Sequence, residues 1–105
     1  MTTSARFLIL WDTPEDPQEF DRHYREVHIP LAKQMPGLRR YTLSRNAARI
    51  RGGEPYYVIA ELDFDDLASL QKAFESPAGQ QTGADVTNLA RWASVHSMIY
   101  ELEDL

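Results

Sequence analysis

Three histidines, His23, His28 and His96, are the side chains of this sequence best suited to moving a proton near neutral pH. An imidazole with an ordinary pKa of about 6.5 can both accept and donate a proton in that range. His28 is the leading candidate, because Pro30 follows it inside a helical pattern and disturbs the backbone there. We expect His28 to act as a general acid/base at the edge of a cavity. The alternative is a histidine that only bonds a carbonyl freed by Pro30.

The other two histidines have less to support a chemical role. His23 lies five residues before His28, which is about 140° away on an ideal helix. The pair is therefore not expected to hold a metal on one helix face, and His23 is expected to be an exposed helix residue. His96 lies in a strand pattern beside Met98 and Tyr100. It could face a pocket or a dimer seam, and it is a candidate substrate-binding residue.

Glu61 is a carboxylate in an otherwise apolar strand pattern. A buried carboxylate needs a partner, and the functional interpretation is that Glu61 orients or charges the imidazole of His28 as a second catalytic residue. The alternative is an ion pair with an arginine across the sheet. Buried tyrosines are more often core residues with a polar tip than catalysts. Three of them are nevertheless candidates for contacting a substrate: Tyr24, Tyr41 and Tyr57.

A long amphipathic helix is expected to carry His28. Asp16 can cap its N-terminus with Pro17 in the first turn, and Pro36 ends it. One face is charged, and the opposite apolar stripe is formed by Phe20, Tyr24, Val27, Leu31 and Met35. Because Pro30 has no N–H to donate and its ring crowds the preceding turn, we expect a kink near His28 or two short helices that meet there.

The remaining pattern predicts four strands and two further helices. The strands are expected at residues 5–11, 38–50, 56–64 and 94–102, one helix begins after Asp65 or Asp66 and ends at Pro77, and a short helix at 86–92 is capped by Asp85. This order is that of the split βαβ, ferredoxin-like arrangement. It predicts an α+β fold, βαββαβ, with helices on one face of a four-stranded antiparallel sheet.

The sheet face without helices also needs a cover. The expected strand at 5–11 is apolar on both sides, and an open apolar sheet face is typical of a partner site. We expect a homodimer through this sheet face, with a contact on the order of 1,600 Å² or more in total.

Two segments have recognisable sequences: FDRHYREVHIPLAKQMPGLRRY at residues 20–41 and AELDFDDLASLQKAFESPAG at residues 60–79. They resemble the opening signature, and the third strand and second helix, of the EthD family, named for a protein of ethyl tert-butyl ether degradation. The residues that match the signature are Phe20, Tyr24, His28, Pro30, Leu31, Pro36, Gly37, Leu38 and Tyr41. The resemblance implies a dimeric α/β barrel and supports a role for His28. Haem stays an alternative, since related barrels bind it.

Composition and motifs restrict the other function classes. A chain of 105 residues suits one domain, 1–105, and a net charge of −5 argues against nucleic-acid binding. The sequence contains no dinucleotide or phosphate loop, nucleophile elbow or zinc pattern, so we expect no cofactor and no metal. No apolar run approaches the roughly 20 residues of a membrane span, and no signal peptide is recognised. The expected location is the cytoplasm.

Two functions fit these observations. The first is a small cofactor-independent enzyme for a hydrophobic cyclic, aromatic or polyketide-like molecule, with isomerase, cyclase or oxygenase-type chemistry, in a degradation or tailoring pathway. The alternative is a non-catalytic small-molecule binding or accessory protein of a degradation pathway. For either function we expect a cavity of roughly 300 Å³ or more beside His28.

Overall fold

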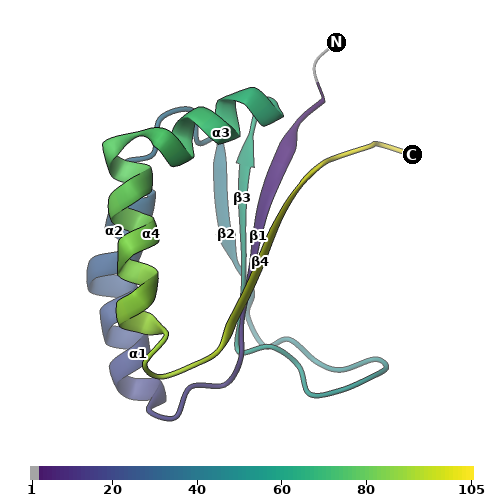
Figure 1. The fold of residues 1–105 in the computed structure, drawn as a ribbon. Helices are drawn as coiled ribbons and strands as arrows, with labels where there is room; N and C mark the ends of the chain where they lie inside the picture. The colour runs from purple at the N-terminus through teal and green to yellow at the C-terminus, as the bar shows by residue number, and fades with distance from the viewer. Residues whose placement is uncertain (1–2) are drawn as a thin grey trace.

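A four-stranded antiparallel sheet carries every helix on the same face (Figure 1). The structure is a computed structural model and describes residues 3–105. In chain order its elements are β1 (Ala5–Trp11), α1 (Pro17–His23), the π-helical turn η1 (Tyr24–His28), α2 (Ile29–Ala32), β2 (Arg40–Leu43), β3 (Val58–Phe64), α3 (Leu67–Glu75), α4 (Pro77–Leu89) and β4 (Val95–Glu101). The strand order β2-β3-β1-β4 is that of the ferredoxin-like fold, which confirms the predicted fold class.

The central strand β1 separates two different environments. It pairs with β3 and β4, so that Phe7 lies opposite Leu62 on one side and Ile99 on the other. Because side chains alternate along a strand, Phe7 and Trp11 face the helices, while Leu8 faces the open side. Trp11 and Leu62 are almost fully buried. The apolar run of β1 therefore serves both faces of the sheet, as its sequence predicts.

The first helical segment is broken at the place where Pro30 predicts a disturbance. Asp16 caps α1 and accepts a hydrogen bond from the backbone N–H of Glu19 at 3.2 Å, as expected. Across η1 the N–H of Ile29 bonds the carbonyl of Tyr24, five residues earlier, which defines a π turn. Pro30 then lies in the first turn of α2, where no N–H donor is required. The π turn is thus how the chain accommodates this proline.

The second helical segment differs from its prediction. Ser76 caps a new helix, α4, by accepting a hydrogen bond from the N–H of Gly79 at 3.0 Å. Pro77 therefore begins a helix, as proline often does, and the expected short helix at 86–92 with Asp85 as its cap is wrong. Gly79 permits the tight corner between α3 and α4, because a Cβ there would overlap the carbonyl oxygen of Ala73. Asp85 lies inside α4, where it is buried.

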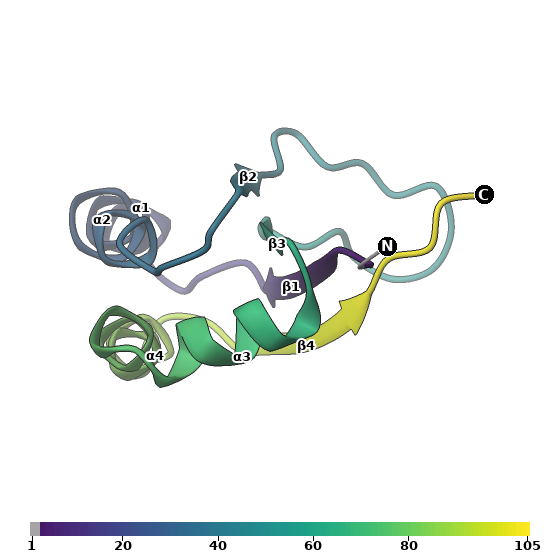
Figure 2. The same cartoon turned by 90° about the horizontal axis from the view of Figure 1, so that it is seen from above.

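The two helical columns lie beside each other on the sheet. Figure 2 shows α4 alongside the α1–α2 column, with α3 leading from the sheet into α4. Strand β2 is shorter than predicted, and residues 44–57 form a loop that extends away from the helices (Figure 1). Within residues 3–105 no helix combines the length and the apolar character needed to span a membrane.

Candidate functional site

A cavity of about 400 Å³ lies between the sheet and the helices. This volume is within the range of about 300–1,000 Å³ that is usual for small-molecule sites, and it meets the expectation of a cavity beside His28. Its lining contains no Asp, Glu, Lys or Arg; it consists of Phe7, Ile9, Trp11, Tyr24, His28, Ala32, Met35, Tyr41, Leu62, Phe74, Gly79, Gln80, Thr82, Gly83, Val86, Val95 and Ser97. Such walls suit an uncharged, largely apolar ligand.

His28 combines an anchored ring nitrogen with an open one. Its Nδ1 lies 2.9 Å from Oδ2 of Asp85. A carboxylate can only accept, so Nδ1 carries the proton and Nε2 carries a lone pair. Among the described residues Nε2 has no hydrogen-bond partner, and it is not one of the buried atoms. It is therefore accessible, and His28 is one of the residues that line the cavity. Burial lowers the pKa of His28, although Asp85 acts in the opposite direction. The ring is therefore a neutral base near pH 7.

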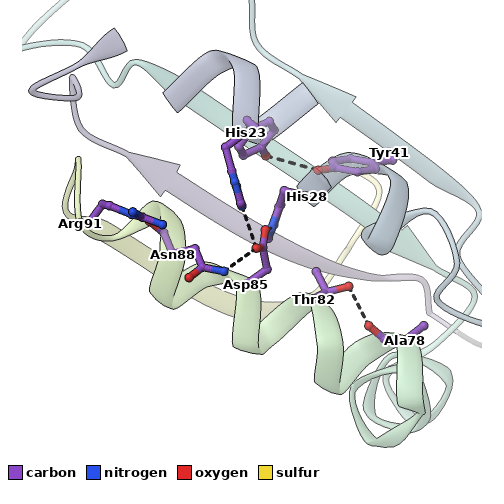
Figure 3. A network of polar contacts seen from close by, with 9 residues as sticks. His23, His28, Tyr41, Ala78, Thr82, Asp85, Asn88 and Arg91 are labelled. Atoms are coloured by element: carbon purple, nitrogen blue, oxygen red, sulfur yellow. Dashed lines mark hydrogen bonds and ion pairs between the residues drawn. The ribbon is translucent and has the colours of Figure 1, made fainter. Parts of the chain in front are cut away.

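Asp85 is the centre of a polar network between α1, η1 and α4 (Figure 3). Its Oδ2 bonds His28, and its Oδ1 lies 2.7 Å from Nε2 of His23 and 3.0 Å from Nδ2 of Asn88. Burial acts to raise the pKa of Asp85, but hydrogen bonds from Asn88 and the two histidines outweigh it and lower that pKa. The carboxylate therefore stays charged although it is buried.

The π turn is what brings the two histidines to one carboxylate. In an α-helix the hydrogen-bonded partner of residue i is i+4, whereas in a π turn it is i+5. His23 and His28 are five residues apart across η1, so their rings come to nearly the same side and both point at Asp85 (Figure 3). The prediction that His23 is an exposed residue on the opposite flank is wrong, since it assumed ideal α-helical spacing.

Tyr24 and Tyr41 border the cavity, as expected for residues that would contact a ligand. The Tyr24 ring lies 5.2 Å from the His28 ring, measured between centroids, and its hydroxyl oxygen is 3.3 Å from that of Tyr41. Burial raises the pKa of both hydroxyls above the ordinary value for tyrosine. Both groups therefore remain protonated, and while one hydroxyl donates to the other, the second keeps a free O–H that can donate to a ligand oxygen.

Glu61 lies on the opposite face of the sheet from His28. It alternates with Ala60 and Leu62, which are buried beneath the helices, so its side chain points outward. There its Oε2 is 3.1 Å from a guanidinium nitrogen of Arg6. The expected pairing of Glu61 with His28 is wrong, and the alternative of an arginine across the sheet is confirmed.

Tyr57 and His96 also lie away from the cavity. The Tyr57 hydroxyl donates to the carboxylate of Asp21 at 2.8 Å. His96 pairs with Leu10 between β4 and β1 and is exposed on the outer face. Neither contributes to this cavity within one chain, so the structure separates Tyr57, Glu61 and His96 from the group formed by Tyr24, His28 and Tyr41.

Asp85 and His23 are the residues that sequence reasoning missed. A usable signal for Asp85 was the pair Ser76–Pro77, which is typical of an N-cap followed by the first helical position. A helix begun there has Thr82, Asp85 and Leu89 on one buried stripe. Within residues 3–105, no group of three or more His, Cys, Asp or Glu side chains is arranged to hold a metal ion.

Comparisons with known proteins agree on the family. The EthD domain model matches residues 12–92. An uncharacterised 11.0 kDa protein from the thcB–thcC intergenic region of Rhodococcus erythropolis is 38% identical over 86 residues, which cover 81% of this chain and 82% of that protein. The crystal structure of an EthD family protein from Bacillus halodurans C-125 is 32% identical with a TM-score of 0.82, and the match covers 95% of this chain and 99% of that one.

A more distant solved structure shares the fold. The cofactor-independent oxygenase SnoaB from Streptomyces nogalater has a TM-score of 0.69 at 16% identity, over 99% of this chain and 97% of that one. At this identity the likeness concerns the backbone arrangement alone.

Proposed function

This chain belongs to the EthD family, and from that premise we propose that it is a cofactor-independent enzyme that moves a proton on a hydrophobic cyclic, aromatic or polyketide-like molecule. The observation that carries the proposal is the state of His28. Its Nδ1 is held by Asp85 while its Nε2 is open to an apolar cavity. A base in that state can accept a proton from a bound ligand.

The reaction we infer is proton abstraction next to a ring carbonyl. His28 takes the proton at Nε2, the C–H electron pair moves toward the carbonyl oxygen, and the resulting enolate oxygen accepts a hydrogen bond from the Tyr24 or Tyr41 hydroxyl. Asp85 acts as a positioning residue that fixes the tautomer and stabilises the imidazolium. Where a C=C bond is conjugated with the enolate, return of the proton from His28 to the far carbon gives an isomer. Attack of the enolate carbon on a second carbonyl gives a cyclised alkoxide, which takes the proton back from His28.

Hydrogen–deuterium exchange tests this function without knowledge of the natural substrate. The probe is 2-tetralone, a bicyclic ketone whose protons next to the carbonyl can be followed by NMR in D₂O. We expect the protein to accelerate exchange above buffer, and His28→Gln to remove about 10²-fold or more of that acceleration. His96→Gln, on the outer face, is the matched histidine control and should retain it.

The same experiment decides between an enzyme and a binding protein. If wild type and His28→Gln both bind 2-tetralone, as judged by ligand-induced NMR shifts, and neither accelerates exchange, the general-base proposal fails. The result would then favour the binding or accessory role.

We also propose that the chain forms a homodimer through the outer sheet face. That face carries Leu8 and Leu10 together with Met98 and Tyr100, whose residues are 49% and 36% exposed in the single chain. Sedimentation velocity at micromolar concentration should give twice the 12.1 kDa chain mass. Leu8→Glu should shift the protein to monomer and Val27→Glu, on the helical side, should not. A wild-type monomer would contradict this proposal.

A further inference from the structure

Two imidazoles compete for one carboxylate in this protein. Nε2 of His23 lies 2.7 Å from one oxygen of Asp85, and Nδ1 of His28 lies 2.9 Å from the other. We propose that His23 is a positioning residue that holds His28 in its neutral, proton-accepting form by taking up the first proton that the cluster binds. This inference deepens the proposed function and rests on it for its chemical meaning.

Charge balance is the first argument for this role. One carboxylate can neutralise one imidazolium, but a second imidazolium beside it leaves an uncompensated positive charge in a poorly hydrated site. Asp85 is the one carboxylate within ion-pair distance of either ring among residues 3–105. The two histidines therefore cannot both become charged without a penalty.

Exposure decides which ring is charged first. The His23 side chain is 20% exposed and the His28 side chain 8%. A charged ring loses more hydration when it is more deeply buried, so the first proton is expected on His23. His28 then keeps the lone pair on Nε2 that the proposed reaction needs.

The neighbouring groups do not offset this effect. On the α4 side Asn88 is a neutral donor to the same carboxylate. The Arg91 guanidinium lies 4.7 Å from the centre of the Trp92 ring, and that ring is 6.0 Å from the ring of His23. On the cavity side the Tyr24 hydroxyl is protonated, and the positive charge of Arg25 acts on Tyr24 and Tyr41. These groups are neutral or positive, so the negative charge shared by the two rings comes from Asp85.

The experiment is an NMR titration of the His28 ring nitrogens in substrate-free protein. His23→Gln retains an N–H donor for Asp85 but cannot become charged. If His23 restrains His28, the pKa of His28 rises in His23→Gln, and the acid limb of 2-tetralone exchange moves to higher pH by the same amount. His96→Gln should change neither. An unchanged His28 titration in His23→Gln would overturn the proposal.

If His23→Gln does not fold, the same NMR titration of the wild-type protein provides the test. The chemical shifts of His28 must then show an inflection at the pH where His23 titrates, because the two rings share a carboxylate. Two independent titrations, or a His28 ring that charges before His23, would overturn it. Since no substrate is present, failure here is distinguishable from failure of the exchange assay.

Discussion

Two three-membered ionic networks lie on opposite faces of the same sheet, and their compositions are reversed. On the helical face one carboxylate, Asp85, bonds the two imidazoles of His23 and His28 at 2.7 and 2.9 Å. On the outer face one guanidinium, that of Arg6, bonds Glu61 at 3.1 Å and Asp63 at 2.7 Å. The first network is largely buried, whereas the members of the second are 20–36% exposed.

The two networks differ in whether their cationic groups can change charge near neutral pH, and this decides which network can perform chemistry. A guanidinium stays charged at every ordinary pH, and hydrogen bonding to Asp63 raises the pKa of Arg6 further. The outer network therefore has one charge state near neutrality and links β1 to β3. Imidazoles change charge near pH 6–7, so the inner network can gain and lose protons next to a cavity.

Asp85→Asn should give the largest effect, because it removes the negative charge that His23 and His28 share. An amide oxygen can accept from one imidazole, while the new amide N–H₂ faces the other N–H donor. We expect the free energy of unfolding at pH 8, measured in urea, to fall by about 2–4 kcal/mol. 2-Tetralone exchange should fall by about 10²-fold. A loss of stability below about 0.5 kcal/mol would mean that the carboxylate does not hold this network.

The pH dependence of stability should separate the two networks next. The pKa of His28 is lower in the folded protein, because burial disfavours the charged ring. Near pH 6 His28 therefore binds more protons in the unfolded chain than in the folded one, and the stability that depends on His28 falls as pH drops below about 6.5. The lowered pKa of Asp85 adds a further loss below about pH 4, where the carboxylate binds a proton in the unfolded chain before it does so in the folded one.

Urea titrations from pH 8 to about pH 3 check this expectation. His28→Gln should remove the loss near pH 6, whereas Arg6→Met should retain it. A stability difference between wild type and His28→Gln that does not shrink on acidification through pH 6 would contradict a His28 that is buried in its neutral form.

Arg6→Met should have a smaller effect. At a protein concentration low enough to dissociate the proposed dimer, it leaves Glu61 and Asp63 without their shared cation, but both carboxylates can be hydrated. We expect a loss of about 1 kcal/mol in the free energy of unfolding, since partly exposed ion pairs contribute little. The NMR signals of the His28 ring should not change. A change in those signals would mean that the outer network acts through the sheet on the site.

Glu61→Gln should have the smallest effect. Asp63 remains to bond Arg6, so the expected loss is under about 0.5 kcal/mol, and 2-tetralone exchange should stay at the wild-type rate. A tenfold loss of exchange would contradict the separation of the two networks.

Asp85 takes the role that was expected for Glu61 as the partner of His28, and the reason is the alternation of side chains along β3. The alternation in β3 places Glu61 outside once Ala60 and Leu62 are inside, and that alternation was readable. Whether a carboxylate on the outer face finds an arginine depends on which strands pair, which the pattern of one strand does not contain. The order of elements, by contrast, was sufficient to predict the ferredoxin-like sheet.

The position of His28 was predictable and its partners were not. Pro30 predicts a disturbed backbone, but the pattern does not say that the disturbance is a π turn. That single change from i+4 to i+5 bonding moves His23 onto the side of His28. With a helix ending at Pro77, the pattern predicts Asp85 as the cap of a later helix; because Pro77 instead begins a helix after Ser76, Asp85 lies inside it.

The proton-accepting role of His28 depends on which tautomer its neutral ring adopts. Long-range nitrogen–proton NMR of the histidine rings at pH 8 reports which ring nitrogen carries the proton. A proton on Nδ1 and a bare Nε2 are predicted, because Asp85 accepts from Nδ1 and the cavity leaves Nε2 open. A neutral ring protonated on Nε2 would contradict both the hydrogen bond and the proton-accepting role.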